Sequence, residues 1–118
     1  MKLKTVHREN IFIPEFNGNK DLSESDQVKI QIKKWPTVTE IKAYKSFKID
    51  SSGSVEMSYK DNIMIPSCVG RITGLNDGKS DIKNGSDLAM STNPILGDLI
   101  TELREHILSD GEEIEPGE

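Results

Sequence analysis

The sequence predicts an α+β fold, with a small antiparallel sheet, two or three helices and an amphipathic C-terminal helix. Residues 27–34 (QVKIQIKK) alternate apolar and polar side chains, which is typical of a half-buried strand. Residues 37–48 open with a helix-capping sequence and continue with apolar residues at helical spacing. Residues 93–109 repeat apolar residues every three or four positions, which indicates a helix with one buried face.

The first part of the chain predicts an antiparallel hairpin with a long loop. Residues 11–16 (IFIPEF) are apolar and partly β-branched, so we expect a strand. Pro14 cannot donate a ladder hydrogen bond, which places this strand at a sheet edge or ends it there. Residues 17–19 (NGN) form a turn signal. In the second strand, alternation directs three residues to one face: Val28, Ile30 and Ile32.

A helix is expected to follow. Thr37 and Glu40 have the spacing of a capping box, in which each side chain accepts a hydrogen bond from a free backbone N–H. The helix is expected to end near Lys48 and to present one apolar stripe, which consists of Val38, Ile41, Tyr44 and Phe47. Residues 51–54 (SSGS) predict a loop tip or a flexible linker.

The middle of the chain is ambiguous. Val55, Met57 and Tyr59 alternate as in a strand, whereas Tyr59 and Ile63 would share a helical face. We favour a strand first, and we expect Pro66 to break whatever element precedes it.

Another strand and a short helix are expected before the C-terminal helix. Residues 68–75 predict a strand whose core residues are Val69, Ile72 and Leu75. Residues 76–78 (NDG) predict a tight turn. Ser86 is positioned to cap a short helix over 86–90.

The predicted helix over 93–109 has residues typical of a helix start, and it has one apolar face whose cover the sequence does not specify. Asn93 can cap it, and Pro94 suits the first helical position. Glu102 and His106 lie four residues apart on the wet side, where they can pair if the histidine is charged. The apolar face consists of Ile95, Leu96, Leu99, Ile100, Leu103 and Ile107. This face needs cover from the rest of the chain or from a partner.

Length and composition indicate one small domain. The chain has 118 residues, of which 34% are hydrophobic and 5% aromatic. These low fractions predict a marginal core and leave a homo-oligomer open. We expect a single domain over 1–109, with 1–10 frayed, and a disordered acidic tail over 110–118.

Charge argues against a nucleic-acid partner. The net charge is −5, and residues 49–118 hold fourteen Asp and Glu against five Lys and Arg. Residues 1–48 hold ten basic and six acidic residues, which fits a solvated surface. No apolar run approaches the length of a membrane span, and the N-terminal residues do not resemble a secretory signal. The expected location is the cytosol.

Residues with catalytic or ligand-binding potential are scattered. Cys68 is the only cysteine, and we expect it to be a buried hydrophobe. His7 and His106 lie far apart in sequence, and His106 is expected to be partly exposed. Residues 77–87 are rich in Asp, Asn, Gly and Ser but lack the ligand frame of a calcium loop. We therefore predict no catalytic, cofactor-binding or metal-binding residue and no enzymatic activity.

The segment order resembles a family of bacteriophage proteins. The N-terminal IFIP, the strand VKIQIK and the helix start PTVTE are followed by CVGRITGL, IKNGSDL and PILGDLITELREHIL. This order over 11–108 is similar to the tail assembly chaperones of long-tailed bacteriophages. Two segments depart from the family pattern, in which a helix is more common where residues 55–59 read as a strand. In addition, Gly70 and Gly74 have no side chains to pack, in a segment that usually carries larger residues in the family.

The resemblance implies a non-enzymatic role in tail morphogenesis in the host cytoplasm. Such chaperones are implied to coat the helices of the tape measure protein and to recruit tail tube subunits. The alternative is a structural virion protein of the neck, tail tube or baseplate, located in the virion. Trp35 can be a core residue or an exposed interface anchor. The residues expected to bind a partner are Trp35, Tyr44, Phe47, Leu96, Leu99, Leu103 and Ile107.

Overall fold

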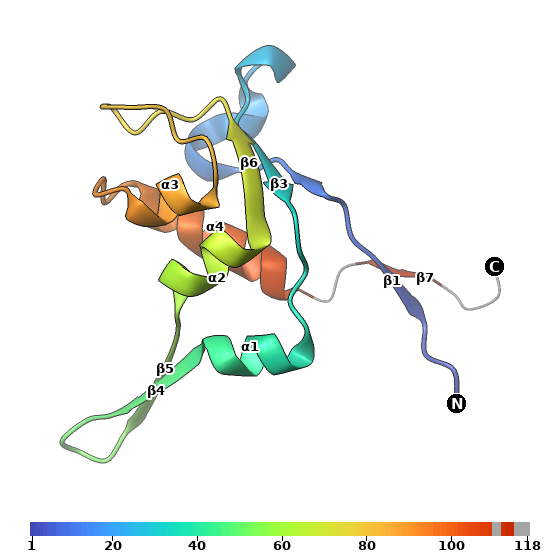
Figure 1. The fold of residues 1–118 in the computed structure, drawn as a ribbon, viewed down its shortest axis with the longest axis vertical. Helices are drawn as coiled ribbons and strands as arrows, with labels where there is room; N and C mark the ends of the chain where they lie inside the picture. The colour runs from blue at the N-terminus through green and yellow to red at the C-terminus, as the bar shows by residue number, and fades with distance from the viewer. Residues whose placement is uncertain (110–111, 115–118) are drawn as a thin grey trace.

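A computed structural model describes residues 1–109 and 112–114 and has the predicted α+β architecture (Figure 1). Three antiparallel β-ribbons or sheets form within the described residues, and four α-helices accompany them. In chain order the elements are β1 (Thr5–His7), β2 (Ile11–Phe12), the 3-10 helices η1 (Phe16–Asp21) and η2 (Glu24–Asp26), β3 (Lys29–Ile32), α1 (Val38–Tyr44), β4 (Lys45–Ile49), β5 (Val55–Tyr59), α2 (Asp61–Cys68), β6 (Val69–Thr73), α3 (Gly85–Met90), α4 (Leu96–Leu108) and β7 (Glu112–Ile114).

The central sheet has the strand order β2-β3-β6, and both pairings are antiparallel. Phe12 lies opposite Ile30, and Ile30 lies opposite Ile72. The predicted hairpin with a long loop is therefore confirmed. The first strand is shorter than expected because it ends before Pro14, which is buried and cannot donate to a ladder. The predicted turn over 17–19 is present, with Asn17 and Gly18 at positive φ.

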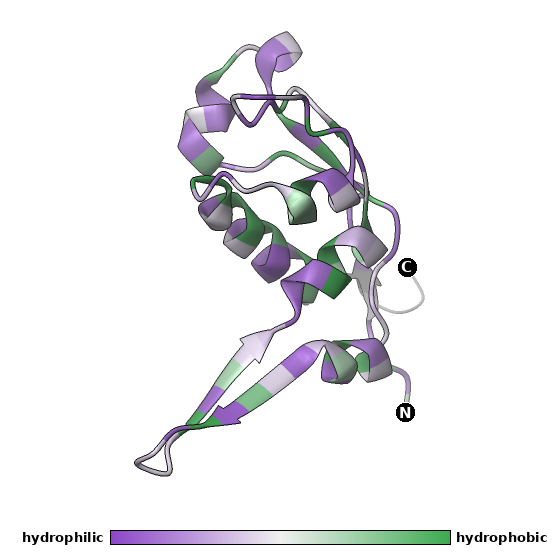
Figure 2. Cartoon of the chain, turned by 60° about the vertical axis from the view of Figure 1, so that its left-hand side comes forward, coloured by the Kyte–Doolittle hydropathy of each residue, from purple (hydrophilic) through white to green (hydrophobic). Residues whose placement is uncertain are grey.

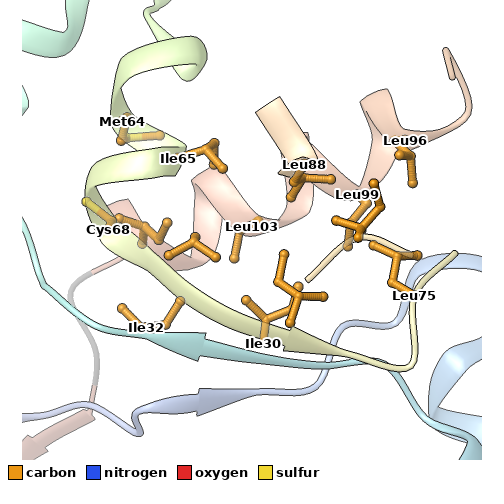
Figure 3. Packing of buried hydrophobic residues seen from close by; sticks show 14 of the residues in the cluster. Ile30, Ile32, Met64, Ile65, Cys68, Leu75, Leu88, Leu96, Leu99 and Leu103 are labelled. Atoms are coloured by element: carbon orange, nitrogen blue, oxygen red, sulfur yellow. The ribbon is translucent and has the colours of Figure 1, made fainter. Parts of the chain in front are cut away.

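Helices α2, α3 and α4 cover one face of this sheet and enclose the core (Figures 1 and 3). Alternation correctly predicts three inward residues, which are Val28 just before β3 and Ile30 and Ile32 within it, and each is at most 8% exposed. Strand β6 adds Val69 and Ile72 to the cluster. The helices contribute Met64, Ile65, Leu88, Leu99, Leu103 and Ile107. Cys68 is also fully buried, as expected.

Helix α1 begins as predicted but ends early. The Thr37 hydroxyl accepts a hydrogen bond from the Glu40 N–H at 3.1 Å, and the Glu40 carboxylate accepts one from the Thr37 N–H at 3.1 Å. The helix ends at Tyr44 rather than near Lys48, because Lys45–Ile49 pairs as strand β4 with β5 over five residue pairs. The helical stripe was therefore wrong at Phe47, because a strand ladder and its turn outcompete one further helical turn. It was also wrong at Val38, which lies in the first turn of α1 and is 71% exposed.

Residues 55–67 split into two elements. The expected strand is β5, and α2 follows it from Asp61 to Cys68. The expectation that Pro66 would break this region was wrong, since Pro66 lies inside the last turns of α2. The carbonyl that loses its partner belongs to Asn62, which is exposed and can bond water. Strand β6 then confirms the strand predicted from 68 onward.

The two C-terminal helices differ slightly from their predicted starts. Helix α3 is capped by Asn84 instead of Ser86, and the Asn84 side chain accepts a hydrogen bond from the Asp87 N–H at 2.8 Å. Helix α4 begins at Leu96, after a turn in which the Asn93 side chain accepts from the Ile95 N–H at 3.1 Å. The amphipathic helix predicted over 93–109 is otherwise present.

The chain ends meet in a small ribbon of their own. Strand β1 pairs antiparallel with β7, with Thr5 opposite Ile114. The expectation of a frayed 1–10 and a disordered 110–118 differs from the structure over these paired residues, because each segment gives the other a backbone partner. Residues 110–111 and 115–118 of the expected tail lie outside the described residues. The Arg8 guanidinium donates to the carbonyl of Ile107 at 3.3 Å, which ties this end of the chain to α4.

Candidate protein-interaction surface

The apolar face of α4 is covered by the chain itself. Leu99, Leu103 and Ile107 are 0% exposed, and Leu96 is 4% exposed. They pack against the sheet and against α2 and α3 (Figure 3). Tyr44, from the α1 stripe, is also buried at 7% exposure. These five predicted partner-binding residues therefore form the core instead of an open surface.

Trp35 holds an intermediate position. It is partly buried and packs against the core, with its ring 5.6 Å from the His106 ring in an edge-on geometry. The Arg8 guanidinium lies 4.8 Å from the Trp35 ring centre, within the range of a cation–π contact. Trp35 thus fits the alternative of a residue that packs on the core better than that of an exposed interface anchor.

His106 is partly exposed, as expected, but its ring is packed against residues from distant parts of the chain. Its ring stacks on Phe12 with 4.0 Å between ring centres, and its Nε2 is buried without a hydrogen-bond partner. Desolvation, and secondarily the charge of Arg8, lower the pKa of His106 below its usual value. Glu102, the expected partner, instead accepts hydrogen bonds from the Glu15 and Phe16 N–H groups at 2.7 and 3.0 Å. The segment over residues 12–16 packs beside α4, and it supplies both the ring that stacks on His106 and the N–H groups that bond to Glu102.

The exposed apolar surface lies on the β4–β5 arm, a two-stranded ribbon over residues 45–59 that projects from the body (Figures 1 and 2). Phe47 lies opposite Met57, and Ile49 lies opposite Val55. Because alternate residues of a strand share a face, all four lie on the same side of the ribbon. Phe47, Ile49, Val55 and Met57 are 66%, 71%, 64% and 44% exposed. We call these four residues the apolar arm face.

The opposite side of the arm is polar. Register places Ser46 opposite Ser58 and Lys48 opposite Glu56. The arm is therefore an amphipathic ribbon without cover on its apolar side. Of the seven residues predicted to bind a partner, only Phe47 belongs to this face. The alternation on both sides of the SSGS turn could have revealed Ile49, Val55 and Met57, but we assigned the first half of that pattern to a helix.

The base of the arm is fixed to the body by one cluster. The Arg104 guanidinium donates to Asp61 at 2.6 Å, where both side chains are about a quarter exposed (24% and 28%). The same guanidinium lies 5.7 Å from the ring centre of Tyr59, the last residue of β5. Tyr59 also packs against the core. This cluster sets the direction in which the arm projects.

The tip of the arm is a well-bonded turn. Oδ1 of Asp50 accepts hydrogen bonds from the Ser52 and Ser54 N–H groups at 2.9 and 3.0 Å and from the Ser52 hydroxyl. These bonds lower the pKa of Asp50. Gly53 has φ +85°, a conformation that favours glycine. The ribbon is thus closed at its far end without help from the rest of the chain.

The histidine and cysteine side chains, which could bind a metal ion or act as nucleophiles, lie outside the arm and do not cluster within the described residues. Within residues 1–109 and 112–114, no cluster of three or more His, Cys, Asp or Glu could hold a metal ion. Burial raises the pKa of the Cys68 thiol.

A hollow of about 480 Å³ on the outer face of the sheet is lined by Ile11, Lys29, Gln31, Arg71 and Thr73. In the acidic loop over 77–87, Asp77 Oδ1 accepts hydrogen bonds from the Lys79 and Ser80 N–H groups, as an ordinary turn residue does.

No family model, curated protein or solved structure matches this chain. Among the described residues, the helices are too short or too polar to cross a membrane. Inference about function therefore depends on the arm, on the body that holds it and on the resemblance in segment order.

Proposed function

We propose that this protein is a non-enzymatic protein-binding factor that acts through its apolar arm face. The observation that supports this most strongly is the exposure of four large apolar side chains on one side of a projecting ribbon. A lone two-stranded ribbon is marginally stable in water, and an uncovered apolar side gives it nothing to pack against. Contiguous apolar surface of this kind is typical of interaction sites.

Within that class, we propose a tail assembly chaperone of a long-tailed bacteriophage, acting in the host cytoplasm. The order of segments over 11–108 supports this reading, and its clients would be the tape measure protein and tail tube subunits. The client-binding role that we first expected of α4 passes to the arm, because the α4 face is occupied by the core.

The dimensions of the arm fit an apolar helix. Five residues at about 3.3 Å each make a ribbon of roughly 16 Å, which equals about 11 residues, or three turns, of a helix. The apolar side of such a helix could lie along the ribbon in the manner of helix-in-groove recognition. Since one arm covers only about three turns, a long client helix would need many copies bound side by side.

Co-expression with a tape measure fragment tests the proposal. We expect the soluble fraction of the fragment to rise when this protein is present, and the two to co-purify. An unrelated folded protein of similar size and charge serves as the control for expression load. Equal solubility with and without this protein, while this protein itself is folded, would reject the chaperone function.

A second candidate is a structural virion protein of the neck, tail tube or baseplate. It is favoured by the second ribbon, β1–β7, because subunits of assemblies use projecting ribbons to reach their neighbours. Mass spectrometry of purified particles separates the two candidates. A chaperone is absent from finished virions, whereas a structural subunit is present in a fixed ratio to the other tail proteins.

A further inference from the structure

We propose that two copies of the free protein close their apolar arm faces against each other in a two-fold, antiparallel pair, which a client must displace. The pairing itself follows from the arm alone; only the displacement by a client rests on the proposed function. The pair would keep the face out of water until a client arrives.

The face is suited to meet a copy of itself. In a two-fold interface the same residues occur on both sides, so the surface must be self-complementary. With the ribbons antiparallel and centred on the Phe47–Met57 pair, the two-fold axis crosses the ribbons and places Phe47 against Phe47 and Met57 against Met57 of the partner copy, so the phenyl rings can pack on each other in one apolar layer. Ile49 and Val55 near each tip would then cover the end of the face next to Tyr59 of the other copy.

Charge selects the antiparallel arrangement. Lys45 lies at the base of the ribbon, opposite Tyr59, and Asp50 lies at the tip. Antiparallel ribbons bring the Asp50 carboxylate of each copy toward Lys45 of the other. Parallel ribbons would bring Lys45 of both copies to the same end of the pair, away from Asp50, and would crowd the two bodies there. The Ser52 and Ser54 donors all bond to Oδ1 of the Asp50 carboxylate, so Oδ2 is the oxygen that would accept from a partner.

The size of the face predicts weak association. Four apolar side chains from each copy give far less than the roughly 800 Å² per partner that standard stable interfaces bury. We therefore expect a reversible dimer, which is what displacement by a client requires. A longer client helix contacts several arms at once and gains from their combined binding, whereas a second copy does not.

Sedimentation velocity of the full chain tests the pairing. We expect the apparent mass to rise from 13.2 kDa toward twice that value as concentration rises from about 1 μM to several hundred μM. Phe47→Asp should remain a monomer throughout, while Ser58→Asp, which adds the same charge on the polar side, should associate like the wild type. A wild type that stays monomeric, or a Phe47→Asp variant that associates equally, would overturn the pairing.

A charge exchange tests its direction. Lys45→Glu and Asp50→Lys should each associate less than the wild type, and a mixture of the two should recover association, because each contact in the mixed pair again joins opposite charges. Asp50 also holds the turn, so thermal unfolding must show that the variant is folded. If it is not, Lys45→Glu alone decides: association as strong as the wild type in low salt would reject the antiparallel pair.

The pairing and the proposed function fail separately. A monomeric wild type that still keeps a client fragment soluble, with loss of this activity in Phe47→Asp, would reject the pairing alone. A wild type that pairs but leaves the client insoluble would reject the chaperone function alone.

Discussion

Gly85 shows how closely one backbone position is constrained. A Cβ at this residue would lie 2.7 Å from the carbonyl oxygens of Ile65 and Val69, which belong to backbone that cannot easily move. Helix α3 therefore approaches α2 and β6 at a distance that only glycine permits. The contrasting case is Gly97 in α4, where a Cβ would meet no atom within 4 Å.

Substitution of these two glycines by alanine should have opposite effects. Gly85→Ala should lower the free energy of unfolding by about 1–3 kcal/mol, the usual cost of overpacking. Gly97→Ala should raise it by about 0.5–1 kcal/mol, because alanine is the better helix residue in open space. Urea unfolding followed by circular dichroism measures both. Equal effects of the two substitutions would contradict the packing of α3.

His106 makes stability depend on pH. Its pKa is lowered in the folded protein, chiefly by desolvation, with Arg8 adding to the effect and Glu102 opposing it. In the unfolded chain it titrates near its ordinary value of about 6.5. Between these two pKa values the unfolded chain binds more protons, so stability rises with pH there. The contribution of the neutral ring is complete above the unfolded pKa and is lost as pH falls.

Thermal unfolding between about pH 7.5 and 5.5 tests this linkage. We expect the melting temperature of the wild type to fall on acidification through this range. His106→Phe, which keeps a ring to stack on Phe12, should show a flatter profile. The lowered pKa values of Glu40, Asp50 and Asp77 act at more acidic pH and should not contribute here. Parallel profiles for both proteins would be inconsistent with a desolvated, neutral His106 ring.

At the level of elements, local chemistry predicts starts better than ends. The Thr37–Glu40 capping box forms as expected, because both partners lie within one turn. The end of α1 at Tyr44 depends on the pairing of β4 with β5, which a helical stripe cannot reveal. Pro66 is tolerated in α2 because its lost partner, Asn62, is exposed.

Helix α4 illustrates the difference between an element and its role. The apolar period predicts which residues share a face, and the structure confirms it for Leu96, Leu99, Leu103 and Ile107. The prediction was wrong for Ile95, which precedes the helix and is 60% exposed. The period does not say what covers the face. The core cluster decides this, since Leu99, Leu103 and Ile107 are fully buried within one chain. The environment of His106 was equally hidden, because Phe12 and Trp35 reach it from distant parts of the sequence.

Leu103→Ala tests whether α4 belongs to the core of the isolated chain. We expect a loss of about 2–5 kcal/mol in the free energy of unfolding, because truncation leaves a cavity between α4 and the sheet. Ile95→Ala, next to the same helix but 60% exposed, should change it by less than about 0.5 kcal/mol. A small effect at Leu103, comparable to that at Ile95, would mean that the face is open in solution.

The whole molecule is more extended than its length requires. Its radius of gyration is 16.3 Å, against roughly 13–14 Å for a compact chain of this size. The β4–β5 arm and the β1–β7 ribbon both project from the body (Figure 1). The low apolar fraction of the sequence indicated a marginal core and a possible role for association. Which surface is left for a partner depends on long-range strand pairing. From the sequence we expected partner contacts at Trp35, Tyr44 and Phe47 as well as on the C-terminal helix.

The most direct test is a comparison of Phe47→Asp with Ser58→Asp in the co-expression experiment with a tape measure fragment. Both variants add one negative charge to the same ribbon, on its apolar and its polar side. If the apolar arm face binds the client, Phe47→Asp should lower the amount of soluble, co-purified fragment by about tenfold or more, a loss of at least about 1.4 kcal/mol, and Ser58→Asp should match the wild type. Equal recovery of the fragment with both variants would contradict a client site on the arm.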